Sequence, residues 1–211
     1  MTRWTRRAID AFKVWRESDE TCVRRRYRDR LGREPDLDEP CRFNDKVLWM
    51  SLFERDPRWV TCADKFAVRA FVEERVGERY LIPMLAVADD AGAIEFDRLP
   101  EAFIAKATHA SGWNLLVRDR SGFDPRAARR TLARWLEKNY YVGKREWQYR
   151  DIQPRIVIES LLTDARGRIP DDVKLWCFGG GGRDAILVQV DVDRFERHRR
   201  AFYDLDWNRL P

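Results

Sequence analysis

The sequence is poor in the residues that most often bind metals or form disulfides. It contains two histidines, His109 and His198, and four cysteines that lie far apart with no Cys-x-x-Cys pair. This scarcity argues against a zinc site with the usual ligand spacing and against a disulfide framework. We expect the cysteines to be reduced, buried thiols.

The sequence also lacks a long apolar run. None approaches the roughly 20 residues that a helix needs to cross a bilayer, and no apolar segment of a signal peptide follows the arginines at the N-terminus. We therefore expect a cytoplasmic protein. The chain has 211 residues, of which 44% are apolar and 36% are charged, and it can bury a sizeable core as one globular unit of two lobes.

Positive charge is concentrated at the N-terminus. Residues 1–33 carry 11 Lys and Arg against 5 Asp and Glu, a balance of +6, whereas the remainder carries −1. Apolar residues recur there at helical spacing, which predicts one long helix or two, ending near Gly32 and Pro35. The arginines are either ligands for the phosphates of a membrane or nucleic acid, or a solvated face on a helix whose aromatic stripe packs on the body.

Two helices and a strand are predicted in the next segment. The first helix is capped by Asn44 and stopped by Asp56-Pro57. Its predicted apolar face comprises Val47, Leu48, Leu52 and Phe53. The second helix spans about 60–76, ends at Gly77, and is followed by a strand at 80–83.

The segment FIAKATHASGWNLLVR, residues 103–118, predicts a strand, a loop and a second strand. The loop at 109–112 is small and polar, so its backbone N–H groups can approach an anion closely, and Lys106 on the entering strand can reach the same phosphate oxygens. The spacing matches neither the Walker loop nor the dinucleotide fingerprint, because no helix follows. We interpret the segment as a candidate nucleotide-phosphate site.

A helix is predicted to begin at Asp124-Pro125, with the aspartate as its cap. Its predicted buried side comprises Ala128, Leu132, Trp135 and Leu136. The following segment, 139–149, is rich in aromatic residues and is predicted to be an ordered loop. It either covers a base or a sugar or packs against the body.

The last third of the sequence predicts antiparallel strands with charges in apolar surroundings. Glu159 lies in an otherwise apolar row, and Lys174 projects from a mainly apolar strand. Strands at about 173–178 and 185–190 flank the run 179–182 of four glycines, which predicts a β-turn rather than a phosphate cradle. The isolated charges are either nucleotide ligands or partners in internal salt bridges.

Several segments, in order between about Arg42 and Asn208, resemble the TupA-like branch of the ATP-grasp proteins, which is known from cell-envelope polysaccharide and teichuronopeptide synthesis. They are RFNDKVLWMSLFERDP, CADKFAVRAFVEERVGERYLIPML, FIAKATHASGWN, LEKNYYVGKREWQYRDIQPRIVIESLL, KLWCFGG and QVDVDRFERHRRAFYDLDWN. The resemblance implies an α+β, two-lobed ATP-grasp-like fold with an N-terminal helical extension and an incomplete C-terminal lobe. The implied segments are the extension at 1–41, an N-terminal lobe at 42–100, a nucleotide-binding central lobe at 101–162, and the start of the C-terminal lobe at 163–211.

The resemblance assigns phosphate contacts to two lysines of the first lobes. Lys65 is similar to the lysine of an Asp-Lys pair that reaches the ATP phosphates. Lys106 is similar to the lysine that contacts the α-phosphate and adenine before a flexible loop. The loop residues implied in nucleotide binding are His109, Ser111, Gly112 and Trp113.

The resemblance also assigns roles to the hinge strand and the strand after it. Glu159 is similar to the acidic hinge residue, and Ser160, Leu161 and Leu162 are implied to present backbone groups to adenine. Ser160 stands where the family usually has lysine, and one adenine contact implied by the resemblance depends on that position. Lys174 resembles the basic residue that acts on the γ-phosphate or on an acyl phosphate, so we name it as the candidate catalytic residue.

The implied activity is that of an ATP-dependent carboxylate–amine ligase with an acyl-phosphate mechanism. ATP and Mg²⁺ are the implied cofactors, and the partners are a carboxylate-bearing sugar or amino acid and an amine. The family's metal ligands are expected after the segment FYDLDWN, so none is assigned and Asp206-Trp207-Asn208 is left out. A chain without them is expected to bind nucleotide weakly, with little magnesium dependence and no detectable acyl-phosphate formation, because the charge of the transferred phosphoryl group is poorly neutralised. It is also expected to self-associate through an exposed sheet edge.

Two alternatives remain open. One is a glycosyltransferase-type protein of polysaccharide synthesis, for which 191–193 and 204–206 offer weak Asp-x-Asp motifs. The other is a non-catalytic protein of this fold that binds an anionic polymer or a membrane through residues 1–33. A nucleic-acid partner is not expected.

Overall fold

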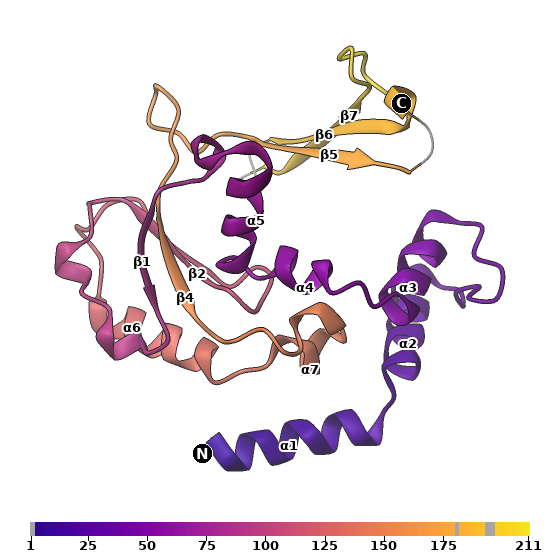
Figure 1. Ribbon diagram of the computed structural model, residues 1–211, viewed down its shortest axis with the longest axis horizontal. Coiled ribbons are helices and arrows are strands. Elements are labelled where there is room, and N and C mark those ends of the chain that lie inside the picture. The colour runs from indigo at the N-terminus through magenta and orange to yellow at the C-terminus, as the bar shows by residue number, and fades with distance from the viewer. Residues whose placement is uncertain (1–2, 180–181, 193–196) are drawn as a thin grey trace. The chain divides into compact units, whose positions relative to one another are not determined.

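The computed structural model describes residues 3–179, 182–192 and 197–211. They form two compact units, Met1–Leu161 and Leu162–Pro211. Helices and antiparallel sheets occur together, so the predicted α+β class is confirmed (Figure 1). The finer division into four segments stays a prediction.

The N-terminal segment of the first unit forms two helices. They are α1 (Arg3–Arg16) and α2 (Asp19–Leu31). Ser18 separates them and caps α2, because its hydroxyl accepts a hydrogen bond from the N–H of Thr21 at 3.1 Å. Gly32, at φ +68°, ends α2 in the left-handed conformation that glycine adopts most easily.

One of the two interpretations of this segment was that its aromatic stripe packs on the body, and this does not hold for Phe12 and Trp15 of α1. Cys22 and Tyr27 of α2 are buried, whereas Phe12 and Trp15 of α1 are exposed. Tyr27 is also tied to the following segment by a buried carboxylate. Asp45, 1% exposed, accepts hydrogen bonds from the Tyr27 hydroxyl and from Arg33 Nη1, the latter at 3.1 Å.

Three further helices lead to the first strand. They are α3 (Phe43–Phe53), α4 (Arg58–Ala63) and α5 (Ala67–Val76). Three predictions are corrected here. Arg42, not Asn44, precedes α3, and no side chain caps it. Val47 and Phe53 are exposed, while Leu52 is buried.

The helix predicted at 60–76 is broken into α4 and α5 at Asp64. Asp64 has an extended backbone, and its carboxylate accepts a hydrogen bond from the N–H of Phe66 at 2.8 Å, which turns the chain. Gly77 ends α5 as predicted. The strand predicted at 80–83 is displaced, because Tyr80 lies in a 3-10 turn and the strand begins after Pro83. The short 3-10 helices are η1 (Glu78–Tyr80), η2 (Ala91–Ala93), η3 (Phe96–Arg98), η4 (Trp147–Tyr149) and η5 (Gly182–Ala185).

A four-stranded antiparallel sheet forms the centre of the first unit, with strand order β1-β4-β2-β3. Its strands are β1 (Met84–Ala88), β2 (Phe103–Ala107), β3 (Asn114–Val117) and β4 (Ile156–Ser160). The predicted strand, loop and strand at 103–117 are therefore confirmed as the β2–β3 hairpin. β4 inserts between β1 and β2 and pairs with both.

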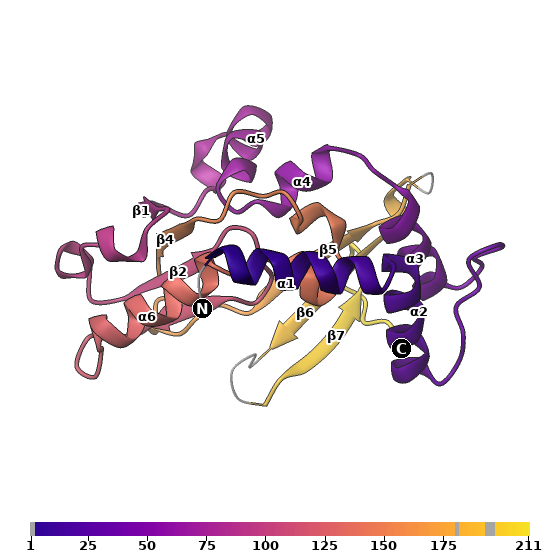
Figure 2. The ribbon, with the colours of Figure 1, turned by 90° about the horizontal axis from the view of Figure 1, so that it is seen from below.

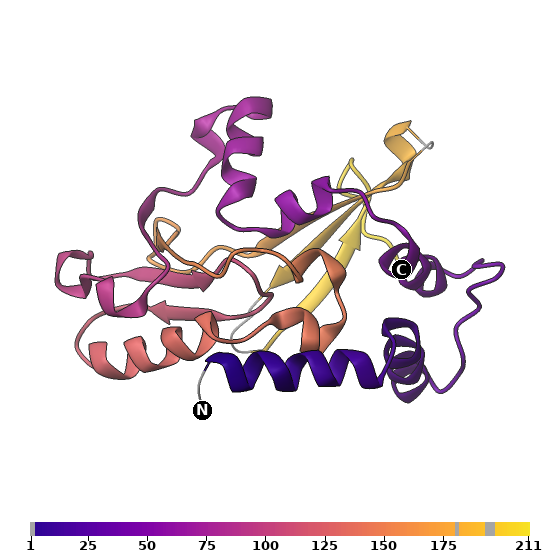
Figure 3. The same cartoon turned by 60° about the horizontal axis from the view of Figure 1, so that its bottom comes forward.

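One face of this sheet is covered by α6 (Pro125–Leu136), which runs alongside it (Figure 3). The predicted cap is confirmed, because the Asp124 carboxylate accepts hydrogen bonds from the N–H groups of Arg126 and Ala127. The shared core contains fully buried Phe103, Leu132 and Ile158. Because side chains alternate along a strand, Lys106 and Glu159 project from the opposite face.

The aromatic segment at 139–149 was predicted to be a loop, and this prediction is wrong. The segment forms a short helix, α7 (Tyr140–Lys144), followed by η4. Asn139 caps α7 by accepting a hydrogen bond from the N–H of Tyr141. Tyr140 and Tyr141 are buried. These rings pack within the first unit, which agrees with the packing alternative.

The second unit is a three-stranded antiparallel meander. Its strands are β5 (Asp172–Cys177), β6 (Ile186–Val192) and β7 (Arg199–Tyr203). The two strands predicted here are confirmed. The predicted glycine turn includes Gly180 and Gly181, which lie outside the described residues.

The prediction of buried cysteines holds for Cys22 alone. Cys41, Cys62 and Cys177 are exposed, and all four thiols are free. Among the described residues, no helix combines the length and apolar character needed to cross a membrane.

Candidate functional site

Glu159 organises a cluster of charges on the face of the first sheet opposite α6. It is 7% exposed, so its carboxylate needs partners. Lys106 Nζ lies 2.5 Å from Glu159 Oε2, and Arg69 Nη1 lies 3.1 Å from Oε1. Arg69 also donates from Nη2 to the carbonyl of Ile82 at 2.8 Å. Each carboxylate oxygen thus binds its own cation, one from β2 and one from α5.

Lys65 is a third cation, placed by the break between α4 and α5. Its Nζ donates to the carbonyl of Ala107 at 3.0 Å and to the carbonyl of Ala110. Burial, reinforced by the charge of Lys106, lowers the pKa of Lys65 to about 8. An ammonium has three N–H groups, and these carbonyls take two. Lys65 therefore fixes both ends of the 107–110 segment and keeps one N–H for another acceptor.

The cluster carries excess positive charge. Lys65, Lys106 and Arg69 contribute three cations, whereas Glu159 and the buried Asp64 contribute two anions. Partly desolvated cations around one carboxylate attract a further anion more strongly than surface lysines do, because water screens them less. This arrangement suits a phosphate group.

The loop between β2 and β3 is held firmly at its start. The N–H of Thr108 donates to the Arg155 carbonyl at 2.9 Å, and the Thr108 hydroxyl donates to the Gln153 carbonyl at 3.1 Å. The tip differs, because Ser111 and Gly112 are exposed and Gly112 adopts φ +77°. The exposed tip is the part of the loop that a ligand can approach.

His109 is turned into the core rather than toward solvent. It is 2% exposed, and its Nε2 lies 3.1 Å from the carbonyl of Trp135, which can only accept. Nε2 therefore carries the proton. Burial lowers the pKa of His109, so the ring is neutral at pH 7. In this structure His109 anchors the loop on α6, and its role toward a nucleotide stays a prediction.

Aromatic rings pack beside the loop tip. Trp113 meets Tyr140 edge-on with centroids 5.8 Å apart, and Tyr140 meets Tyr149 at 4.9 Å. Burial raises the pKa of the Glu146 carboxyl next to these rings. Trp113 is thus part of the wall that supports the loop.

Ser160 at the end of β4 and the two residues after it were predicted to present backbone groups to adenine. The N–H of Ser160 donates to the Pro83 carbonyl at 3.0 Å, so that donor is already used inside the first unit. Leu161 ends the first unit, and Leu162, which is 49% exposed, begins the second. Their predicted roles stay untested.

Lys174, the candidate catalytic residue, belongs to a cluster in the second unit. Asp191 on β6 is 2% exposed and lies 2.5 Å from Lys174 Nζ, 2.6 Å from Arg200 Nε and 2.9 Å from His198 Nε2. Gln189 Nε2 also donates to it at 2.6 Å. The hydrogen bonds from Arg200 and then Lys174 hold the pKa of Asp191 far below its usual range.

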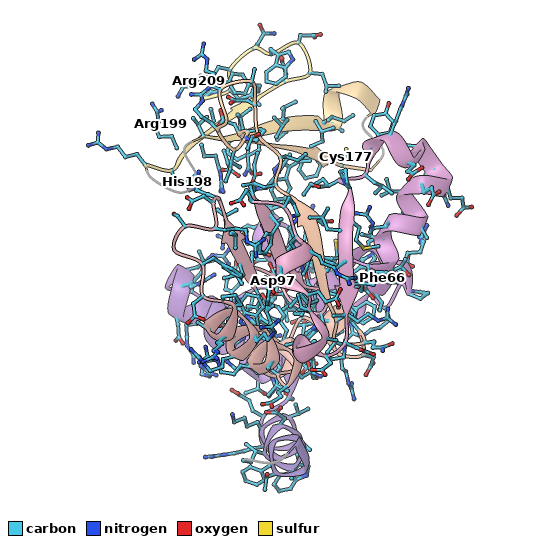
Figure 4. All side chains as sticks on the ribbon, turned by 90° about the vertical axis from the view of Figure 1, so that its left-hand side faces the viewer. Phe66, Asp97, Cys177, His198, Arg199 and Arg209 are labelled. Atoms are coloured by element: carbon cyan, nitrogen blue, oxygen red, sulfur yellow. The ribbon has the colours of Figure 1, made fainter. Side chains whose placement is uncertain are left out.

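This cluster gathers at one end of the second sheet. In Figure 4 the labels of His198 and Arg199 lie together at one end of the second sheet, and the label of Cys177 lies at the other end. The pairing of Asp191 with Arg200, far from the pairing of Cys177 with Ile186, agrees with that placement.

The weak Asp-x-Asp motifs do not form metal sites among the described residues. Asp191 is occupied by cations, and Asp193 lies outside the described residues. The Asp204 carboxylate accepts hydrogen bonds from the N–H groups of Asp206 and Asn208, which closes a turn. Within the described ranges, no group of three or more His, Cys, Asp and Glu side chains is arranged to bind a metal. The described carboxylates therefore do not by themselves form a magnesium site.

Arg69 was missed by the sequence analysis. It lies four residues after Lys65, a spacing that places two side chains on one helical face, and this signal was available in the sequence.

Comparison with known proteins gives one match. A family model described as TupA-like ATPgrasp matches residues 45–211. No curated protein and no solved structure matches the chain.

Proposed function

Because this chain belongs to the TupA-like ATP-grasp family, we propose that it is an ATP-dependent ligase that joins a carboxylate to an amine through an acyl phosphate. The observation that carries the proposal is the Lys65, Lys106 and Arg69 cluster around Glu159, next to an exposed loop tip. Membership of the family indicates ATP as the ligand, and the cluster provides cations where a phosphate of that nucleotide can bind.

In this proposal Lys106 and Lys65 contact ATP phosphates. Glu159 holds Lys106 in place before ATP binds, which lowers the entropic cost of ordering a long side chain. Phosphoryl transfer depends mainly on positioning and on neutralising charge, so fixed cations are effective catalytic groups. Ser111 and Gly112 provide the loop tip that approaches the phosphates.

The chemistry proceeds in two transfers. A carboxylate oxygen of the substrate attacks the γ-phosphorus of ATP, the bond to the β-phosphate oxygen breaks, and ADP leaves. The amine nitrogen then attacks the acyl carbon, the bond to the phosphate oxygen breaks, and the amine loses a proton as the amide forms. Lys174 is proposed to neutralise charge on the transferred phosphoryl group. Mg²⁺ is proposed from the family alone, since the described carboxylates do not form its site.

We propose a carboxylate-bearing sugar or amino acid as the acceptor of the phosphoryl group, and cell-surface polysaccharide synthesis as the setting. The proposed substrate class and the proposed setting both rest on the family membership, because no residue of this chain identifies either of them. A screen of uronic acids and amino acids, with ADP release as the readout, tests the substrate class.

Titration calorimetry with ATP tests the site. Lys106→Ala and Lys65→Ala should each weaken ATP binding by about 1.5–3 kcal/mol, the range for a hydrogen bond to a charged group. Lys46→Ala is the matched control, because Lys46 is an exposed lysine on α3. If all three variants bind ATP as the unmodified chain does, the cluster is not the phosphate site.

A further inference from the structure

The apolar stripe of α1 is uncovered by the described residues. Trp15 is 82% exposed, Phe12 is 55% exposed and Ile9 is 42% exposed. The Phe12 and Trp15 rings lie 5.9 Å apart, so they form one continuous patch. Exposing two neighbouring aromatic rings costs free energy unless another surface covers them.

α1 is held in place without using this stripe. Arg145, 4% exposed, donates from Nη2 to the carbonyls of Lys13 at 3.0 Å and Glu17 at 3.3 Å. The Lys13 carbonyl belongs to the last turn of α1, where carbonyls lack helical partners and a cation is favoured. Tyr141 adds a hydrogen bond to Asp19 at 2.8 Å, just after α1. The helix is therefore attached by its C-terminal end, and its aromatic face stays outward.

The views agree with this attachment. α1 runs along the edge of the first unit in Figure 1, and in Figure 2, seen from that side, it lies in the foreground.

The charge of α1 indicates what covers the stripe. The helix carries five basic residues against one acidic residue, Asp10. Lys13 and Arg16, both exposed, lie in the same turns as Phe12 and Trp15. An anionic polymer would satisfy the cations but not the rings, and a protein surface would not require so many cations. A membrane surface supplies anionic headgroups and, directly below them, an apolar layer in which tryptophan is favoured.

We propose that α1 docks the first unit on an anionic membrane surface, with Phe12 and Trp15 inserted at the headgroup level and Lys13 and Arg16 on the headgroups. This attachment is independent of the ligase chemistry.

Vesicle co-sedimentation tests the proposal with the full chain. Vesicles of phosphatidylcholine mixed with phosphatidylglycerol should bind the chain, and vesicles of phosphatidylcholine alone should bind it much less. The double variant Phe12→Ala/Trp15→Ala should lose binding by about tenfold or more, because two inserted rings are removed. Lys13→Glu/Arg16→Glu should also lose about tenfold, and added salt should weaken binding of the unmodified chain.

Two control variants test whether vesicle binding depends on α1 or on exposed apolar side chains and charges elsewhere in the first unit. Val76→Ala/Tyr80→Ala removes two exposed apolar side chains elsewhere in the first unit, and Arg30→Glu reverses an exposed charge on α2. Both should bind vesicles as the unmodified chain does. Equal binding to both vesicle types, or unchanged binding by the α1 variants, would overturn the proposal. A third outcome would also overturn it: the unmodified chain binds no vesicles but forms a dimer in light scattering, and the double α1 variant abolishes that dimer. The stripe would then cover a second copy of the chain.

Discussion

At the scale of single residues, the carboxylate of Glu159 keeps Lys106 and Arg69 partly buried on one face of a sheet. Lys106 and Arg69 are respectively 21% and 17% exposed in their side chains. Removing one partner of a buried pair leaves the other charge without compensation, which is costlier than never having the pair. Glu159 is therefore both a stabilising residue and a residue that positions Lys106.

This dual role predicts the behaviour of Glu159→Gln. The substitution keeps the side-chain volume and removes the charge, so the free energy of unfolding should fall by about 1–3 kcal/mol as two cations lose their counterion. The affinity for ATP should change as well, because Lys106 is no longer fixed. Urea unfolding and calorimetry measure the two effects. Glu137→Gln, at an exposed position, is the control; a loss of stability with unchanged ATP affinity would make Glu159 purely structural.

Lys65 predicts a pH dependence of stability. Its pKa in the folded chain is about 8, below the ordinary 10.5, so between these values the unfolded chain binds more protons. The contribution of Lys65 therefore makes the free energy of unfolding rise with pH from about 8 to 10.5, whereas below 8 its destabilising effect is complete and constant.

Lys65→Met should remove this rise, and the exposed control Lys46→Met should retain it. Urea unfolding below pH 8 and again between pH 8 and 10.5 provides the comparison. Identical pH profiles for the two variants would show that Lys65 titrates normally in the folded chain.

The sequence predicted part of this cluster for a physical reason. Side chains alternate along a strand, so Lys106 and Glu159 could be recognised as charges in apolar rows. Their pairing with each other could not, because it depends on β4 lying next to β2 across a long separation in sequence. The contact of Arg69 with Glu159 likewise joins residues far apart in sequence, and the inward turn of His109 depends on the distant carbonyl of Trp135.

At the scale of elements, local signals succeeded where a cap or a glycine sets the boundary. The Asp124 cap and the stop at Gly77 were predicted, because both act on neighbouring backbone groups. The prediction failed for α4 and α5, since a single hydrogen bond from the Phe66 N–H to Asp64 overrode a helical pattern. It failed for α7 because aromatic residues suit both a loop and a buried short helix.

The loop tip and α7 offer a paired prediction. Gly112→Ala should destabilise the chain by about 1–2 kcal/mol, since φ is +77° there and an added Cβ meets no atom within 4 Å, which leaves the backbone cost alone. Gly143→Ala should instead stabilise it by about 0.5–1 kcal/mol, because Gly143 is helical and equally open. Thermal unfolding measures both, and shifts of the same sign would contradict the assigned conformations.

At the scale of the whole molecule, the two units contain the same arrangement of charges. Each buries a carboxylate on a strand and surrounds it with cations: Glu159 with Lys106 and Arg69, and Asp191 with Lys174 and Arg200. The charge balance of residues 34–211 does not reveal these clusters, because it is only −1. Positive sites in each unit arise from arrangement rather than from composition.

The position of β4 between β1 and β2 has a consequence for the order in which the chain folds. β2 and β3 form a hairpin of neighbouring segments, but β1 has no partner in its sheet until β4 is synthesised, far along the chain. Pairing of such high contact order is slow, since a long loop must close first. In pulse-labelled hydrogen exchange during refolding, amide protons of β1 and β4 should therefore become protected in a single kinetic phase, no earlier than those of the β2–β3 hairpin. Protection of β1 before β4 would contradict this order. A ribosome-bound chain that has not yet released β4 thus carries a first unit with its central strand missing and its hydrophobic core open to chaperones.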